Sequence, residues 1–483
     1  MIKLKLLKNI LGYFVICFTL MALFACKKDF KIEKSTDNVQ DKNIPSELNI
    51  VQFEYDILDI NEAYDDEMII TIDFNKGTVS DGFEFLVRDE GDNVIIKSGA
   101  TYRFTGMLKN KRIWVEKGTN ENVSLILDGL KIDTDKYSAI RVVDDVIAKI
   151  ILADGSENEI NLSVQGNPKQ DAIHPTCIFS RNALTFNGKG KLILNSNSNS
   201  ISSIESDDKV VFIRGEYSFN AKDDSIKAKN AVVFREGNFS INSLDDAIKV
   251  KNNDGGFISV DNATLNIKSG DKGIVSDDKV IVLGGNTYID SAGESISGKT
   301  IDILGGNISL KSGDDAINST DGDQNKKSNQ VGVYTRIAGG TLDIDATMDG
   351  IDSNGDLYLE AGHIFINGAT NDNERIIDYN GKVVCGSELM FCGVGPGAKM
   401  QDFGDDPPRN YLIVYFKEPM KPSDTIRIVD ESDNQIFVFT AKKTYMAALI
   451  ALNELESGKT YKIIAGDKIF AHTITKGKNE IRE

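Results

Sequence analysis

The sequence predicts an all-β fold, a parallel β-helix, because one strand pattern recurs between Asp223 and Asp315. Each unit holds acidic residues, a small residue, an isoleucine, a short β run, a turn with glycine and a second β run. The isoleucines recur 22, 26, 22 and 21 residues apart, at Ile226, Ile248, Ile274, Ile296 and Ile317. A period of roughly 20 to 50 residues is typical of solenoid proteins. Alternating strand patterns without a helical period indicate that each unit is one coil.

The first 25 residues predict a cleaved export signal. Three lysines lead into an apolar run that ends in Leu-Phe-Ala, directly before Cys26. A short apolar segment with small residues at its end is typical of a secretory signal peptide. The ending resembles a bacterial lipobox, in which Cys26 becomes the lipidated N-terminus. An ordinary signal peptide or a membrane-spanning anchor is the alternative.

Lipidation would place the protein on a membrane without spanning it. We therefore expect an exported protein, lipid-anchored in the cell envelope at the outer membrane, with exposure on the cell surface as an option. Residues 26–48 are polar and irregular, which is typical of a flexible tether. No later segment is long and apolar enough to span a bilayer.

The chain is strongly acidic. Its formal net charge is −18, and the predicted cleavage removes three lysines and no acidic residue. Such a chain repels nucleic acids and anionic surfaces unless metal ions intervene. We therefore expect no nucleic-acid partner.

Residues 49–404 are predicted to form the β-helix domain, with strand patterns that begin near Met68. The isoleucine register extends to four further positions: Ile178, Ile204, Ile351 and Ile377. One coil cannot bury its own apolar face, so equivalent residues of adjacent coils must stack. We expect one coil's inward residues to stack on those of the next as follows: Ile226, Phe234 and Ile241 on Ile248, Ile258 and Ile267.

The step from Ile317 to Ile351 is 34 residues long because it contains the polar insertion STDGDQNKKSNQ. Insertions in a solenoid form loops on one face. This loop either overhangs a binding surface or is a tolerated surface loop. Adjacent glycines at 284–285, 305–306 and 339–340 supply turn conformations that other residues resist.

Residues 405–483 are predicted to form a small C-terminal β module or cap. Pro407 and Pro408 mark the boundary, and the repeat then gives way to five short strand patterns joined by polar turns. These patterns indicate antiparallel strands. An uncovered coil end would expose strand edges and core, so we expect the module to close it.

Three cysteines remain after the predicted lipid site, at Cys177, Cys385 and Cys392. A bridge between Cys385 and Cys392 is one option, but connectivity cannot be deduced from sequence. Buried free cysteines inside the coils are the favoured interpretation. No Cys and His spacing predicts a zinc site.

Acidic residues precede the isoleucines in two columns. The column three positions before holds Asp223, Asp245, Asp271 and Asp314, and the column two positions before holds Asp224, Asp246, Glu294, Asp315 and Asp349. Carboxylates stacked about 4.8 Å apart repel by roughly 3.5 kcal/mol at an effective dielectric constant near 20. Such columns need cations between the coils, protonation or nearby lysines.

Calcium is the cofactor that these columns predict, because carboxylates, carbonyls and waters at flexible spacing suit Ca²⁺. The predicted ligands are Asp223, Asp224, Asp245, Asp246, Asp271, Asp314 and Asp315. Lysines just after the isoleucines, at Lys227 and Lys249, offer charge balance without metal. The plainer alternative is that these residues fill turns by bonding to local backbone.

Several motifs resemble a family of bacterial β-helix proteins described as carbohydrate-binding domain-containing proteins. The motifs are SAIRVVDD…IILADGSENEI, FSRNALTFNGKGKLIL, DDAIKVKN, LGGNISLKSGDDAI and DYNGKVV. The resemblance covers roughly Met68 to Gly404. It implies a right-handed parallel β-helix, bound calcium and binding of plant cell-wall polysaccharide, including acidic pectin-type chains. Gly293-Glu294 and Met348-Asp349 replace the Asp-Asp pair, so calcium at those coils is in question.

The family is structurally similar to family 9 pectate lyases, yet its members are regarded as binders. We therefore expect no enzyme, and ionic bridging by Ca²⁺ between the acidic face and sugar carboxylates. One alternative is a calcium-dependent lyase with Lys227 or Lys249 as the base. Another is a surface adhesin or scaffold. Aromatic stacking is predicted to be secondary, with Trp114 in the core and Tyr217 or Tyr288 as candidates on the face.

Overall fold

The computed structural model describes residues 53–55, 68–136, 138–143, 145–164, 175–322, 329–404 and 407–483. The predicted signal peptide, Cys26 and the tether lie outside the described residues. Strands make up the regular structure of the described part, apart from one short 3-10 turn, η2 (Glu84–Leu86). In that part, no helix combines the length and the apolar character that crossing a bilayer requires.

The predicted isoleucine register is confirmed by a parallel sheet, here called the first sheet. The isoleucines pair in an unbroken ladder from Ile178 through Ile226 and Ile248 to Ile377. The strands that contribute to this sheet are β4 (Asn93–Lys97), β6 (Arg112–Glu116), β8 (Ile140–Val142), β11 (Ile178–Ser180), β14 (Ile204–Ser206), β17 (Ile226–Ala228), β20 (Ile248–Val250), the first parts of β23 (Ile274–Val282) and β25 (Ile296–Ile303), β27 (Ile317–Ser319), β29 (Ile351–Ser353) and β31 (Ile377–Tyr379).

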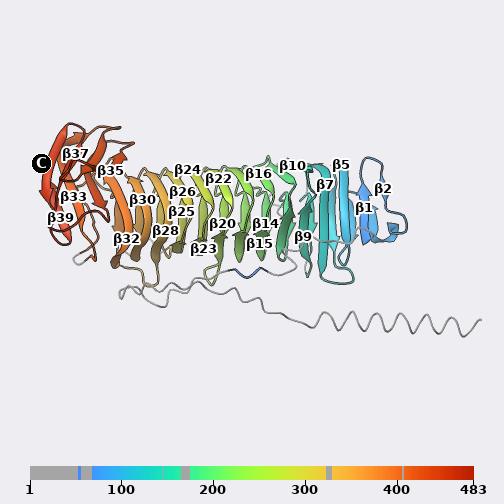
Figure 1. Ribbon diagram of the computed structural model, residues 1–483. Coiled ribbons are helices and arrows are strands. Elements are labelled where there is room, and N and C mark those ends of the chain that lie inside the picture. The colour runs from blue at the N-terminus through green and yellow to red at the C-terminus, as the bar shows by residue number, and fades with distance from the viewer. Residues whose placement is uncertain are drawn as a thin grey trace, which may run out of the picture. The chain divides into compact units, whose positions relative to one another are not determined.

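Two further parallel sheets complete each coil, which makes the domain the predicted parallel β-helix (Figure 1). The second sheet contains β1 (Ile69–Asp73), β9 (Ile147–Leu152), β12 (Leu184–Gly188), β15 (Lys209–Phe212), β18 (Ala231–Phe234), β21 (Phe257–Val260) and the later parts of β23 and β25. The third sheet contains β10 (Glu157–Leu162), β13 (Lys191–Ser196), β16 (Glu216–Ala221), β19 (Asn238–Ser243), β22 (Thr264–Ser269), β24 (Asn286–Ser291) and β26 (Asn307–Ser312). Five long strands run through both sheets: β5 (Thr101–Lys109), β7 (Asn122–Thr134), β28 (Tyr334–Ala346), β30 (Asp356–Asn367) and β32 (Val383–Gly395).

Inward side chains form ladders through the coils. Phe186, Phe212 and Phe234 are buried and stack with ring centroids 4.9 and 5.1 Å apart. The predicted pairing of Ile241 with Ile267 is confirmed.

One predicted stacking partner is wrong. Phe234 pairs with Val260, while Val232 pairs with Ile258. The 26-residue coil places its four extra residues in the turn before β21, so the equivalent of Phe234 lies twelve positions after Ile248 instead of eight, two residues beyond the predicted Ile258.

Glycines in the turns let successive coils approach closely. Gly285 has a φ of +80°, and a Cβ atom there would lie 2.2 Å from the carbonyl oxygen of Ala263. Gly306 repeats the positive φ one coil later. A side chain would therefore both strain the backbone and collide with the neighbouring coil.

The C-terminal strands extend beyond β32 (Figure 1). They are β33 (Tyr411–Met420), β34 (Thr425–Val429), β35 (Gln435–Thr440), β36 (Tyr445–Ala451), β37 (Thr460–Ala465), β38 (Lys468–Thr473) and β39 (Lys478–Arg482). Strand β36 pairs antiparallel with β32 and β33, while β34, β35, β37 and β38 form a four-stranded antiparallel sheet. The sequence analysis missed β38 and β39, and β39 pairs parallel with β33. Tyr411 and Leu449 pack into the same core as Phe391, so this part closes the end of the coils.

The first described coils have antiparallel additions. Strand β2 (Thr78–Val79) pairs with β1, and β3 (Val87–Glu90) pairs with β4. Farther along, the short stretch 53–55 lies on the outside of the second sheet, where Phe53 and Tyr55 cover Val211 and Val233. The Tyr55 hydroxyl donates a hydrogen bond to Asp261.

The three described cysteines are free and buried, so the favoured interpretation is confirmed and the Cys385–Cys392 bridge is absent. Burial raises the pKa of the Cys177 and Cys385 thiols to about 12. We expect none of the three to react with a thiol reagent at pH 8 in the native protein, and all three to react in denaturant. The measurement is a colorimetric thiol titration of residues 27–483. Rapid labelling of one thiol in the native protein would contradict the burial.

Candidate functional site

The acidic columns lie at the corner between the third and the first sheet. Asp245 and Asp246, for example, connect β19 to β20. The residue directly before the isoleucine is Ser, Ala or Gly in the coils from Ile204 to Ile351, and at Gly350 a Cβ atom would lie 2.5 Å from the Ile366 side chain. The small side chain lets the backbone at this corner pack closely against the core. The acidic residues before it line the edge of the first sheet.

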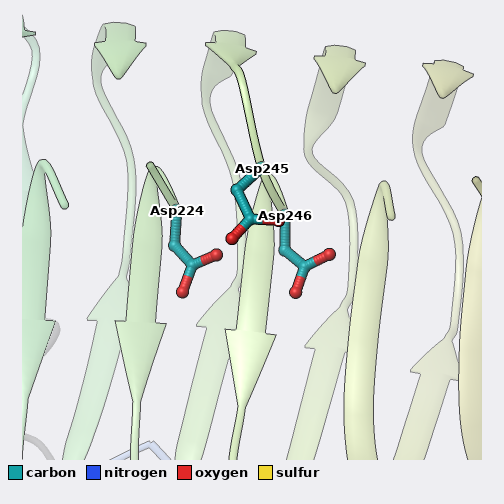
Figure 2. A group of neighbouring side chains, drawn as sticks. All are labelled: Asp224, Asp245 and Asp246. Carbon is teal, nitrogen blue, oxygen red and sulfur yellow. The ribbon is translucent and has the colours of Figure 1, made fainter. Parts of the chain in front are cut away.

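Asp224, Asp245 and Asp246 form the first carboxylate cluster, in which one oxygen from each lies within 4.8 Å of the others. Figure 2 shows Asp224 reaching from one coil toward the two aspartates of the next. Burial, opposed by the charge of Lys249, raises the pKa of Asp224 to about 6.

Lys249 provides a positive charge inside this cluster. Its Nζ lies 3.4 Å from Asp224 Oδ1 and forms a closer ion pair with Asp246. Burial alone would lower the pKa of Lys249, but the hydrogen bond to Asp246 and the two carboxylate charges raise it overall. The first cluster is therefore partly neutralised by the protein itself.

Asp349, Asp352 and Asp378 form a second carboxylate cluster with the same 4.8 Å limit between oxygens. Arg375 forms an ion pair with Asp378, and its backbone N–H donates to Asp349. The sequence analysis noted Asp349 but did not combine these three residues. The signal in the sequence is an acidic residue directly after the isoleucine in two successive coils, at Asp352 and Asp378. The same position of an earlier coil holds Lys249.

Burial is the main reason why two carboxyl groups of the second cluster have raised pKa values. It raises the pKa of Asp349 and of Asp352 to about 7, with neighbouring carboxylates adding to the effect. Asp315 lies beside them and accepts a 2.8 Å hydrogen bond from the Asp349 backbone. Burial, together with the charges of Asp352 and Asp349, raises its pKa to about 9. This end of the corner therefore concentrates four carboxyl groups around the single guanidinium of Arg375.

The other predicted ligands lie on the corner but belong to neither cluster of the described residues. They are Asp223, Asp271, Asp314 and Asp315. Lys272 pairs with Glu294 in the column that holds Asp246, and Lys227 lies 3.4 Å from Glu205. The columns thus divide into segments that lysines neutralise and a segment near Asp352 that they do not.

The donor chemistry of the second cluster fits Ca²⁺. Three carboxylates from adjacent coils present oxygen ligands, and Ca²⁺ takes roughly six to eight oxygens in flexible geometry, with water completing the set. Raised carboxyl pKa values indicate that negative charge here is costly unless a cation binds. A cation would compete with Lys249 in the first cluster and with Arg375 for Asp378 in the second.

Two of the three aromatic predictions differ from the structure. Ile113 and Val115 point into the core, so Trp114 points outward, with the Arg112 guanidinium 4.2 Å from its ring centroid. Tyr217 is buried, and its hydroxyl donates to the Arg214 carbonyl. Tyr288 lies on the outer face of β24 with 47% of its surface exposed.

Comparison with known proteins gives a family match over more than half of the chain. A family model described as "Carbohydrate-binding domain-containing protein" matches residues 90–297 and 271–387. A relative of the same description from Acetivibrio thermocellus is 32% identical over 127 residues, which are 26% of this chain and 44% of the relative. The match therefore spans less than half of that relative's length.

A solved structure also shares partial similarity. It is the polysaccharide lyase-like protein from C. thermocellum, as a gadolinium derivative, with 20% sequence identity and a TM-score of 0.39. The alignment covers 58% of this chain and 94% of that one.

Proposed function

Since this chain belongs to the family of carbohydrate-binding domain-containing proteins, we propose that it binds an acidic, pectin-type polysaccharide through calcium held on the corner of its β-helix. We further propose that Cys26 is lipidated and anchors the protein in the cell envelope, at the outer membrane. The sequence features around Cys26 support the anchor, and the geometry of the second cluster supports the calcium site.

The second cluster is the observation that carries this proposal. Its carboxylates would repel a uronate chain, so direct contact between the two is unfavourable. Asp349, Asp352 and Asp378 would hold the ion, which supplies a positive charge that sugar carboxylates can also bind. Because the coils repeat about every 4.8 Å, the corner presents oxygen ligands along a line that suits a repeating polymer.

We propose binding without catalysis, and the lysine contacts support this choice. A lyase base must lose its proton near neutral pH, which requires a lowered pKa. The pKa of Lys249 is raised by its carboxylate partners, burial notwithstanding. Lys227 forms an ion pair with Glu205 at 3.4 Å. These two ion pairs support the proposal of binding without catalysis.

The test is calorimetric titration of residues 27–483 with polygalacturonate, with and without EDTA, while absorbance reports unsaturated uronate products. We expect heat of binding in Ca²⁺, its loss in EDTA, and no rise in absorbance. A rise in absorbance would identify a lyase instead. Heat that EDTA leaves unchanged would contradict calcium bridging, and the absence of heat in both conditions would favour a surface scaffold.

A further inference from the structure

A polar groove lies over the first sheet between the two carboxylate clusters. It has a volume of about 400 Å³, and its floor is formed by Val275, Ser297, Gly298 and Asn318. Val275, Ser297 and Asn318 continue the outward ladder that holds Lys249 one coil before and Asp352 one coil after. The groove exists because short side chains replace long charged ones at this register.

The walls of the groove come from both edges of the first sheet. Lys272 and Glu294 form one wall as an ion pair. The opposite wall includes Asn253, Asp277, Asn354 and the two ends of the polar insertion at 320–322 and Gln330. The described ends of the insertion therefore line a concave surface.

The chemistry of the groove favours an uncharged ligand rich in hydroxyl groups. Lys272 is paired with Glu294, while Asp277 and Asp321 add negative charge, so a carboxylate or phosphate would be repelled. Among the lining side chains, Val275 is the apolar one, which gives a lipid or aromatic ligand little surface to bury. Amide and hydroxyl groups both donate and accept hydrogen bonds, as sugar hydroxyls do.

Asn318 is the residue best placed to recognise such a ligand. Its Nδ2 donates to Glu294 at 3.4 Å, while its Oδ1 is buried without a hydrogen-bond partner in the described part of the chain. An unpaired buried acceptor is costly, and a turn of the Asn318 amide toward the groove would bring this oxygen within reach of a ligand hydroxyl. Val275, Ser297 and Asn318 span two coil spacings, roughly 10 Å, which is about the length of two sugar units in an extended chain.

We propose that this groove binds a short run of uncharged sugar residues through hydrogen bonds and without calcium. The inference rests on the proposed polysaccharide binding and assigns part of it to a site distinct from the carboxylate clusters. A glycan with both acidic and neutral stretches would then contact the corner through calcium and the groove through its hydroxyls.

Two variants test the groove. Asn318→Ala removes the recognising amide, and Ser297→Met fills the floor with a side chain that cannot hydrogen-bond. The same register holds Lys249 and Glu205 in other coils, so a long side chain is compatible with the fold. Ser309→Met, on the outer face of β26 in the third sheet, is the matched control.

The probes are neutral hexasaccharides of glucose, xylose, mannose and galactose, titrated in EDTA, and polygalacturonate titrated in Ca²⁺. We expect at least one neutral probe to bind the wild type, at least tenfold weaker binding to both groove variants, and unchanged binding to the control. Binding of every neutral probe equally to wild type and groove variants would overturn the proposal. Binding of polygalacturonate but of no neutral probe would also overturn the proposed groove site, while leaving the proposed function intact. If no probe binds at all, both the groove site and the proposed function are overturned.

Discussion

Removing calcium at pH 8 is expected to lower the thermal unfolding midpoint by roughly 3–8 °C, whereas removing it at pH 5 is expected to change the midpoint little. The reason is the second carboxylate cluster. The pKa values of Asp349 and Asp352 are raised to about 7 in the folded protein, mainly by burial. At pH 8 these groups must ionise next to one another, and a bound cation relieves the cost.

The sign of the pH dependence follows from the raised pKa values. A carboxyl group whose pKa is higher in the folded than in the unfolded state keeps its proton longer when folded. The free energy of unfolding therefore falls as the pH rises from the ordinary value near 4 to about 7, and stays low above that. The raised pKa of Asp224, about 6, acts in the same direction. The total loss in the free energy of unfolding over this pH range is on the order of a few kcal/mol. The contributions of the individual groups do not simply add, because the groups are coupled.

Thermal melts followed by circular dichroism, between pH 5 and 8, in EDTA and in Ca²⁺, check this expectation. The control is Asp352→Asn, which keeps the size of the side chain and removes its charge. It should flatten the pH profile in EDTA and reduce the gain from Ca²⁺. Identical profiles with and without Ca²⁺ would show that the cluster binds no stabilising cation.

The second large effect is expected in the core. Phe212→Ala should lower the free energy of unfolding by about 3–5 kcal/mol. Phe212 is fully buried between Phe186 and Phe234, and its ring also meets Tyr217 and Phe239 edge-on at 5.0 and 5.1 Å. Removing it leaves a cavity that two neighbouring coils share.

Chemical denaturation in guanidinium chloride measures this loss. Each coil contacts only its neighbours, so the variant is expected to unfold first around β15. Tyr288→Ala, half-exposed on the third sheet, is the control and should change stability by no more than about 0.5 kcal/mol. Equal effects of the two substitutions would show that the aromatic ladder does not stabilise the coils.

The isoleucine register could be predicted because its inward positions have little freedom. A residue that packs between adjacent coils must be apolar and of nearly constant size, so Ile226 and Ile248 recur visibly. Turn length is less constrained, since extra residues extend into solvent. The misplaced partner of Phe234 shows the result: the predicted Ile258 lies two residues before the true partner Val260, because the turn before β21 gains four residues.

The candidate site was less predictable because it combines residues from different register positions. Asp349 precedes its isoleucine by two positions, while Asp352 and Asp378 follow theirs by one. They meet because the corner and the first sheet are adjacent in space. Trp114 shows a similar limit: its alternation with Ile113 and Val115 favours the core in the sequence analysis, but these two neighbours point inward and Trp114 points outward.

The most direct test of calcium-bridged binding compares the wild type with the double variant Asp352→Asn/Asp378→Asn by polygalacturonate titration in Ca²⁺. Asp223→Asn, on the same corner but outside both clusters, is the matched control. We predict binding by the wild type and the control, and at least tenfold weaker binding by the double variant. Equal binding by all three proteins would contradict the assignment of the calcium site to the second carboxylate cluster.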